Sequence, residues 1–233
     1  MSPRGRHECL PHRFLPGLRC HAPLVAGGRP VRWRWLGWAR GSSYDSAMKT
    51  HLDRAISDLQ KLLPALPAMS GTLERLGNEM LQCWQKRGRV LLAGNGGSAA
   101  DAMHLAEELS VRFNKTRRAL AAVALCDPAA ITCAGNDLGF ESIFSRQVEA
   151  LGNPGDILVV FSTSGNSANI LKAIEQAKSQ GVMTVAFLGK DGGKAKGTCG
   201  IEFVIPSQST ARIQEGHKIL YHTLCDWIDT KVG

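Results

Sequence analysis

Two side chains suited to proton transfer or metal binding, His104 and Glu108, lie four residues apart in the stretch "GNGGSAADAMHLAEEL". Four residues make about one helical turn, so in a helix the imidazole and the carboxylate lie on the same face. Such pairs are also common as plain surface hydrogen bonds. The spacing alone therefore leaves a catalytic pair, a metal site and a surface pair open.

The same stretch opens with a glycine loop that directly follows the apolar run Val90–Ala93. Glycines at a strand-to-helix junction let backbone N–H groups approach a ligand, and the helix N-terminus favours an anion. The loop also fits the dinucleotide pattern G-x-G-x-x-A through Gly94, Gly96 and Ala99. Asp127 follows the next apolar run, where a ribose-binding acid could stand. That short pattern is weak by itself.

A second unusual loop, "FSTSGNSAN", also follows an apolar run. It places four hydroxyls around Gly165 with no charged side chain, from Ser162, Thr163, Ser164 and Ser167. Hydroxyls and free N–H groups at a helix start predict a compact phosphate cradle. The lysine of a nucleotide P-loop is missing, and a helix cap needs only one hydroxyl. We therefore favour a phosphate site over a dinucleotide site or a simple cap.

These loops need a framework of strands and helices to position them. Five short apolar runs alternate with helical patterns: Val90–Ala93, Ala121–Leu125, Ile157–Phe161, Thr184–Leu188 and Ile201–Ile205. Continuous apolar runs are typical of strands buried on both faces, as in a parallel sheet. We predict a three-layer, doubly wound α/β domain with a five-stranded parallel sheet, whose ligands bind at the carboxyl ends of the strands.

Helical patterns precede and follow the sheet. Apolar residues recur at helical spacing over residues 48–63, Pro64 ends that run, and a second helix is predicted over 70–86. We expect these two helices to form an N-terminal helical hairpin. The last helix is predicted over residues 211–231.

The basic character of the chain comes from its first 47 residues. Of the formal charge of +8, residues 1–47 carry +6, from 8 Arg against Glu8 and Asp45, and residues 48–233 carry only +2. The body is therefore nearly neutral, which argues against nucleic-acid binding. We expect the extension to be disordered. It could be a basic, aromatic arm that binds membranes or nucleic acid, or an Arg-rich transit peptide. The interpretation we favour is upstream sequence read in frame before a start at Met48.

Cysteine spacing and hydropathy indicate the cellular compartment of the protein. The seven cysteines form no C-x-x-C pair, which is typical of reduced thiols in a cytoplasmic protein rather than a disulfide framework. No apolar run approaches the roughly 18 residues of a membrane span. We therefore expect a cytoplasmic protein without a membrane partner.

The motifs together resemble the SIS (sugar isomerase) fold and, within it, the phosphoheptose isomerases, also called sedoheptulose 7-phosphate isomerases. Beyond the two loops, "GNDLGF", "GKDGG" and "ARIQEGHKILYH" agree in order, and the resemblance covers residues 48–233. It implies isomerisation of sedoheptulose 7-phosphate to D-glycero-D-manno-heptose 7-phosphate through an enediol, for heptose precursors of lipopolysaccharide core or another glycan. It also implies a homotetramer.

The resemblance assigns roles to individual residues. It implies one zinc ion per subunit on His104, Glu108, Gln214 and His222. We assign Glu108 as the carbon base and His222 as the proton relay. The resemblance places the substrate against Asn95, Gly96, Gly97, Glu108, Asn136, Asp137, Ser162, Thr163, Ser164, Ser167 and Gln214.

The zinc set raises a geometric question. Gln214 and His222 are eight residues apart, about 12 Å along a continuous helix, whereas a metal–ligand bond is about 2.1 Å. Our hypothesis is that a neighbouring subunit supplies one of them, or that Gln214 precedes the regular helix. His217 competes nearby, and we interpret it as supporting or purely structural.

The sequence departs from the family pattern at one position, and two other functions compete with the isomerase. Some family members carry an acid where this chain has Ala211, so proton transfer there weakens or passes to Asp137. One relative with this fold binds the bacterial replication initiator without catalysis, and a sugar-phosphate sensor is the second rival. The retained His104, Glu108, Gln214 and His222 favour the enzyme.

Overall fold

The computed structural model describes residues 43–232, and the predictions made above for residues 1–42 lie outside this range. The sheet consists of β1 (Val90–Gly94), β2 (Ala122–Ala124), β3 (Ile157–Ser162), β4 (Met183–Gly189) and β5 (Ile201–Ile205). The α-helices are α1 (Ser43–Leu62), α2 (Ser70–Gln85), α3 (Gly97–Ser110), α4 (Pro128–Asp137), α5 (Ser145–Leu151), α6 (Ala168–Ser179) and α7 (Thr210–Lys231). Three short 3₁₀ helices are η1 (Leu63–Met69), η2 (Phe140–Ser142) and η3 (Gly193–Ala195). Within residues 43–232, no helix combines the length and the hydropathy that crossing a membrane requires.

All five strands are parallel, in the order β2-β1-β3-β4-β5. The order reverses direction beside β1, as a doubly wound sheet requires. Strands β1 and β3 are buried along their whole length, because helices cover both faces of the sheet. The predicted five-stranded parallel α/β fold is therefore confirmed.

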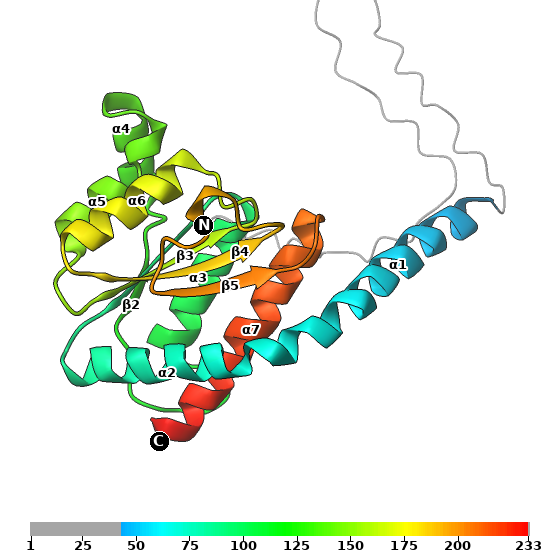
Figure 1. Ribbon diagram of the computed structural model, residues 1–233, viewed down its shortest axis with the longest axis horizontal. Helices are drawn as coiled ribbons and strands as arrows, with labels where there is room; N and C mark the ends of the chain where they lie inside the picture. Colours follow the sequence, from blue (N-terminus) through cyan, green and yellow to red (C-terminus); the bar gives the residue numbers. More distant parts are fainter. Residues whose placement is uncertain (1–42, 233) are drawn as a thin grey trace, which may run out of the picture. The chain divides into compact units, whose positions relative to one another are not determined.

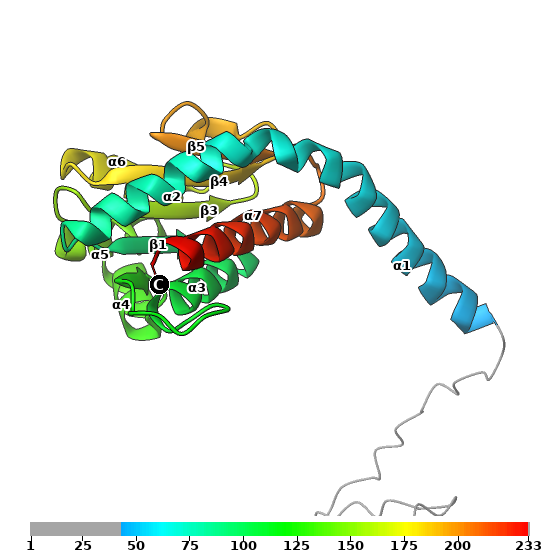
Figure 2. The same cartoon turned by 90° about the horizontal axis from the view of Figure 1, so that it is seen from below.

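Two hydrophobic cores lie on opposite faces of the sheet (Figure 1). Alternate residues of each strand point to opposite sides, so Leu92 and Val159 face α2, α3 and α7, while Leu91 and Leu158 face α5 and α6. Helices α3 and α7 run side by side under the sheet (Figure 2). This pairing brings together residues more than a hundred positions apart.

The N-terminal helical region is present, but it does not form the predicted hairpin. Helices α1, η1 and α2 follow one another without a reversal, and α1 projects beyond the sheet (Figures 1 and 2). Leu62 and Ser70 keep right-handed helical backbone angles on either side of η1. Pro64 therefore ends the α-helix and tightens the chain into a 3₁₀ segment without turning it back.

Helix α1 also starts earlier than expected. It begins at Ser43, five residues before the predicted boundary at Met48. The residues between, "SYDSA", contain neither proline nor glycine, so nothing in them interrupts a helix.

Candidate active site

The two unusual loops lie next to each other at the carboxyl edge of the sheet. Strands β1 and β3 are neighbours, with Gly94 in register with Phe161, so the loops that follow them start side by side. Asn95 and Asn169 then exchange two amide hydrogen bonds, each 2.9 Å long. Asn169 is buried and was not foreseen from the sequence, because its partner lies 74 residues away.

The loop "FSTSGNSAN", called the serine loop below, has hydroxyl groups that can donate to a ligand. The Ser162 hydroxyl accepts a hydrogen bond from the Gly165 N–H at 3.1 Å, and the Ser164 hydroxyl accepts one from the Asn166 N–H at 3.2 Å. Both hydroxyls therefore still have a proton to donate. Ser167 is the N-cap residue of α6, yet its side chain makes no capping hydrogen bond. The alternative that this loop serves only as a cap loses its main support.

A neighbouring turn fixes the shape of the serine loop. Gly165 has a φ of +62°, and a side chain there would collide with the carbonyl of Gly192 in the "GKDGG" turn. The side-chain oxygen Oδ1 of Asn166 accepts from the Lys194 N–H at 3.0 Å, and the Ala195 N–H donates to the backbone carbonyl of Gly165. The serine loop and this turn therefore form one braced unit.

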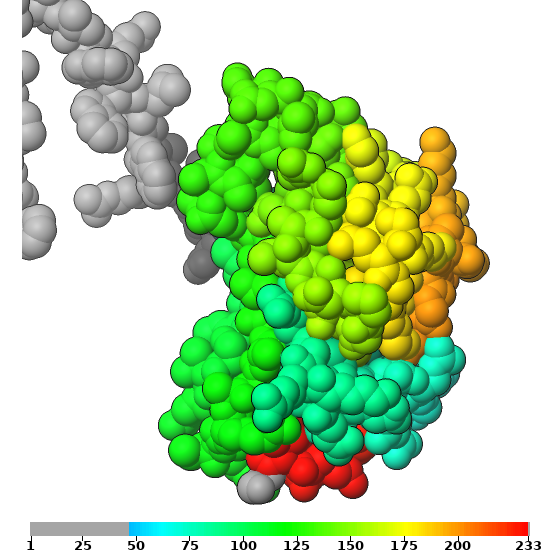
Figure 3. All heavy atoms as spheres, turned by 90° about the vertical axis from the view of Figure 1, so that its left-hand side faces the viewer, coloured from blue at the N-terminus to red at the C-terminus, as the bar shows by residue number. Residues whose placement is uncertain are grey.

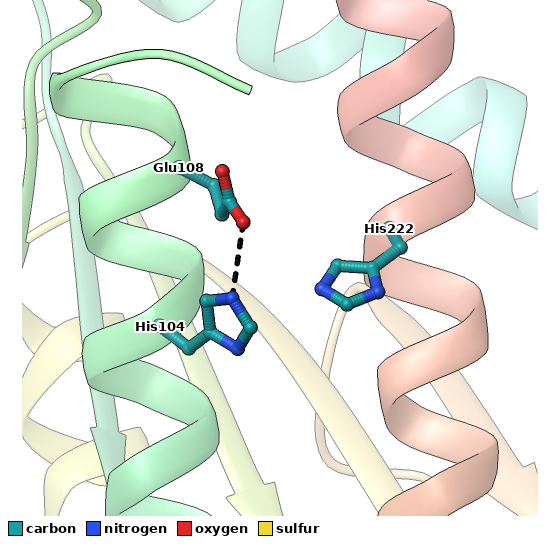
Figure 4. A group of neighbouring side chains, drawn as sticks. All are labelled: His104, Glu108 and His222. Carbon is teal, nitrogen blue, oxygen red and sulfur yellow. Dashed lines mark hydrogen bonds and ion pairs between the residues drawn. The ribbon is translucent and has the colours of Figure 1, made fainter. Parts of the chain in front are cut away.

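Helices α3 and α7 bring three possible metal ligands together. Figure 4 shows His104 and Glu108 of α3 facing His222 of α7. One ligand atom from each lies within 4.8 Å of the other two. His104 Nε2 is 3.0 Å from Glu108 Oε1, and the His222 Nε2 atom is buried with no hydrogen-bond partner in the described part of the chain. Two imidazoles, one of them with an unpartnered nitrogen, and a carboxylate are a donor set that could hold a metal ion.

The surroundings of His222 favour the neutral form of its ring. Burial lowers the pKa of His222, and the neighbouring His104 and Lys218 lower it further, while Glu108 acts in the opposite direction. Phe113 stacks on the ring, with centroids 5.7 Å apart. A neutral imidazole can accept a proton or bind a metal.

A polar cluster that the sequence did not predict lies behind His104. His104 Nδ1 lies 3.1 Å from the Tyr221 hydroxyl and 3.3 Å from Lys218 Nζ. Asp101 Oδ1 lies 3.4 Å from that hydroxyl and 3.3 Å from Lys218 Nζ. Asp101 shares α3 with His104, whereas Lys218 and Tyr221 reach His104 only because α3 and α7 pack side by side.

Gln214 does not join the triad of its own chain. It lies inside α7, so the alternative that it precedes the helix is wrong. It stands eight residues before His222, about 12 Å along the helix. Its amide packs against Gly97, where even a Cβ atom would collide with it. The Gln214 side chain therefore contacts the glycine loop of its own chain.

Within one chain the triad is separate from the two ligand loops. Glu108 follows Gly97, the first residue of α3, by eleven residues, about 16 Å along the axis. His222 is twelve residues into α7, which starts at Thr210. The glycine loop and Glu108 therefore lie near opposite ends of α3.

Asn136 and Asp137 lie in a third place, at the end of α4. The Asn136 amide donates to Asp137 Oδ1 at 2.6 Å. Asp137 lines a groove of about 610 Å³ with Cys133, Leu138 and Arg146, between α4 and α5. Figure 3 shows this face hollowed where the green residues meet the yellow-green ones. His217, by contrast, is fully buried and shares a 2.9 Å hydrogen bond with the Leu188 carbonyl.

Comparison with known proteins gives a consistent result. Residues 56–189 match the SIS domain family. The phosphoheptose isomerase of Fusobacterium nucleatum is 50% identical over 67% of this chain and 80% of its own length. Phosphoheptose isomerase 1 of Campylobacter jejuni is 48% identical over 73% of this chain and 92% of its own.

Solved structures agree with this fold. The phosphoheptose isomerase of Neisseria gonorrhoeae superimposes with a TM-score of 0.70 at 41% identity, over 80% of this chain and 99% of that one. That of Francisella tularensis gives 0.72 at 38% identity, over 82% and 100%. Because the SIS family model matches more than half of the chain and phosphoheptose isomerases match it at 41–50% identity over most of their length, the chain belongs to the SIS domain family and, within it, to the phosphoheptose isomerases.

Proposed function

We propose that this isomerase converts sedoheptulose 7-phosphate to D-glycero-D-manno-heptose 7-phosphate through an enediol, supplying heptose for lipopolysaccharide core or another glycan. The observation that carries the proposal is the serine loop, with hydroxyl donors, no charged side chain and the N-terminus of α6. Such a loop suits a phosphate monoester. Asn95, Gly96, Gly97, Thr163 and Gln214 lie at or beside it in the role of substrate contacts, and Asn136 and Asp137 are proposed to contact the sugar as well.

The proton transfer falls to Glu108 and His222. Aldose–ketose isomerisation moves a proton between the first and second carbons, so it needs a base at carbon and a relay at the oxygens. Glu108 is 14% exposed and hydrogen-bonded to His104, which holds its carboxylate in one place. Because its surroundings favour the neutral ring of His222, its Nε2 can take a proton from a hydroxyl at a stage when that lone pair holds no metal. Groups of this kind each contribute typically 10²–10⁴-fold.

His104, Glu108 and His222 are also the residues that would hold zinc, with Gln214 as the proposed fourth ligand. Bound zinc would polarise the carbonyl oxygen as a Lewis acid. Because Gln214 and His222 stand far apart on one continuous helix, the fourth ligand comes from a neighbouring subunit. The same arrangement would bring the serine loop of one copy to the triad of another.

An assembly of several copies, with a homotetramer as the expected form in the cytoplasm, is part of the proposal. Helix α1 carries an apolar stripe that is open to solvent, formed by Met48, Leu52 and Ile56 at 71%, 59% and 47% exposure. An exposed stripe of this kind on a helix marks an interaction surface. Burying it between copies is consistent with a site completed by a second subunit.

The proposed function is tested by incubating the purified protein with sedoheptulose 7-phosphate and following heptose 7-phosphate by ³¹P NMR. Glu108→Gln should lower turnover at least 10²-fold while sugar-phosphate binding persists, because the amide cannot act as a base. The matched control is Glu107→Gln, since Glu107 is the exposed preceding residue. Turnover retained by Glu108→Gln would remove Glu108 from its role. If the wild-type protein binds the sugar phosphate without converting it, the proposed function is wrong and the rival function, a sugar-phosphate sensor, is supported.

A further inference from the structure

The polar cluster behind His104 is buried and belongs to no role assigned so far. Tyr221 is fully buried, and Asp101 is 4% exposed. Lys218 reaches in from the surface, with its Nζ 2.8 Å from the Tyr221 hydroxyl. Both Lys218 and Tyr221 stand on α7, within one helical turn of His222. The metal triad is thus supported by a layer of hydrogen bonds on its inner side.

Counting donors and acceptors shows what this cluster can do. Asp101 can only accept, and the Lys218 ammonium can only donate. The Tyr221 hydroxyl can do both, and it lies 3.1 Å from His104 Nδ1 and 3.4 Å from Asp101 Oδ1. It is therefore the group that can respond to a change in the proton position on the His104 ring.

We propose that Tyr221 is a positioning residue that holds His104 through Nδ1, so that its Nε2 is directed at Glu108 and His222. This inference rests on the proposed function for the metal site. Histidines that bind metals almost always donate their second N–H to a carboxylate, carbonyl or water. Here a tyrosine hydroxyl stands between the histidine and the carboxylate of Asp101.

The hydroxyl can support both neutral forms of the ring by rotating. When Nε2 carries the proton and donates to Glu108, the Tyr221 hydroxyl donates to Nδ1. When Nδ1 carries the proton, it donates to the Tyr221 oxygen, whose own proton then points to Asp101. In this second form Nε2 has a free lone pair, which a metal needs. The ring holds one proton in both forms, and Tyr221 keeps its own.

The substitution Tyr221→Phe isolates the hydroxyl. It keeps the ring that packs edge-on against His104 and His222, with centroid distances of 5.7 and 4.7 Å. The matched control is Thr223→Val, which removes a hydroxyl from the exposed side of the same helix, where it donates to the Ile219 carbonyl. Equal melting temperatures of the two variants would show that both are folded.

The first measurement is zinc affinity, by titrating Zn²⁺ alone against a competing chelator. We expect Tyr221→Phe to bind zinc about 10–100-fold more weakly than wild type, the usual loss for a partner of a ligating histidine. Asp101→Asn should give a smaller loss, and Thr223→Val none. An unchanged affinity in Tyr221→Phe would overturn the proposal.

The second measurement needs no metal and separates this proposal from the proposed function. Long-range ¹H–¹⁵N spectra of the zinc-free protein report which nitrogen of His104 carries the proton. The Nδ1 resonance should move in Tyr221→Phe and stay in Thr223→Val, and an unmoved resonance would refute the role of Tyr221. If His104→Ala binds zinc as tightly as wild type, the proposed metal site fails, and these spectra alone decide the case of Tyr221.

Discussion

At the scale of single residues, His217 shows how burial can keep an ionisable group uncharged. Its side chain is fully buried between the sheet and α7, with Phe161 and Phe187 beside it. Burial lowers the pKa of His217 to about 4, although its hydrogen bond to the Leu188 carbonyl acts in the opposite direction. The unfolded chain, with an ordinary histidine pKa near 6.5, binds this proton more readily.

The stability of the protein should therefore depend on pH through His217. Its contribution is fully present above about pH 6.5 and is lost as the pH falls toward 4, because the unfolded state gains the proton first. The difference corresponds to about 3 kcal/mol. Urea unfolding between pH 7.5 and 4.5 should show a smaller decrease for His217→Gln, which keeps a donor for Leu188 without a titrating group. Parallel curves for the two proteins would contradict this account.

At the scale of elements, the shape of the serine loop depends on Gly165. A side chain at Gly165 meets the Gly192 carbonyl and has to adopt a φ of +62°. We expect Gly165→Ala to raise the KM for the sugar phosphate at least tenfold and to lower the melting temperature. The control is Gly197→Ala, at a φ of +78° with nothing within 4 Å, which should cost only about 1 kcal/mol of stability. Equal KM values in the two variants would show that this loop does not bind the phosphate.

The end of α3 that carries Glu108 is held by a buried ion pair. Arg117 Nε lies 2.7 Å from Asp229 Oδ1, with both side chains 1% exposed. The Arg117 guanidinium also donates to the carbonyls of Glu108 and Leu109, at 2.7 and 2.8 Å. Arg117 thus caps α3 and ties its last turn to α7.

Removing the charge of Asp229 should be strongly destabilising. Burial alone would raise the pKa of Asp229, but the hydrogen bonds from Arg117, Lys115 and Asn114 bring it below its usual value. Asp229→Asn leaves the Arg117 charge buried without its partner, at a cost of about 3–5 kcal/mol. The exposed Asp226→Asn is the control and should stay within about 0.5 kcal/mol in denaturant unfolding. A similar small effect for Asp229→Asn would show that the pair does not hold α3.

Some of this arrangement was predictable from the sequence, and some was not. The strands and the two ligand loops were predictable, because strands buried on both faces are continuously apolar and phosphate loops need glycine and hydroxyl residues. The direction of the chain after Pro64 was not, since proline shows where an α-helix ends but not whether the chain reverses. The cluster behind His104 was missed because Tyr221 contacts Asp101 and His104 only through the packing of α3 on α7.

At the scale of the whole molecule, helix α1 is positioned but not covered. The Arg212 guanidinium donates to the Ala55 carbonyl at 2.7 Å, which ties α1 to the start of α7. A groove of about 290 Å³ is lined by Leu63, Leu66 and Ile219 among others. Apolar side chains are therefore exposed on α1 and also beside α7.

Charges placed on the stripe should break the assembly and the activity together. The double variant Leu52→Glu/Ile56→Glu puts two carboxylates on a surface that we expect to be buried between copies, where unpaired charges are strongly unfavourable. The control is Arg54→Glu, on the opposite face of α1, which changes the net charge by the same −2. Sedimentation should show smaller species for the double variant alone, with unchanged far-ultraviolet circular dichroism. Because the site is proposed to need a second subunit, turnover should fall in parallel with the assembly, and a dissociated variant of full activity would show that one chain holds a complete site.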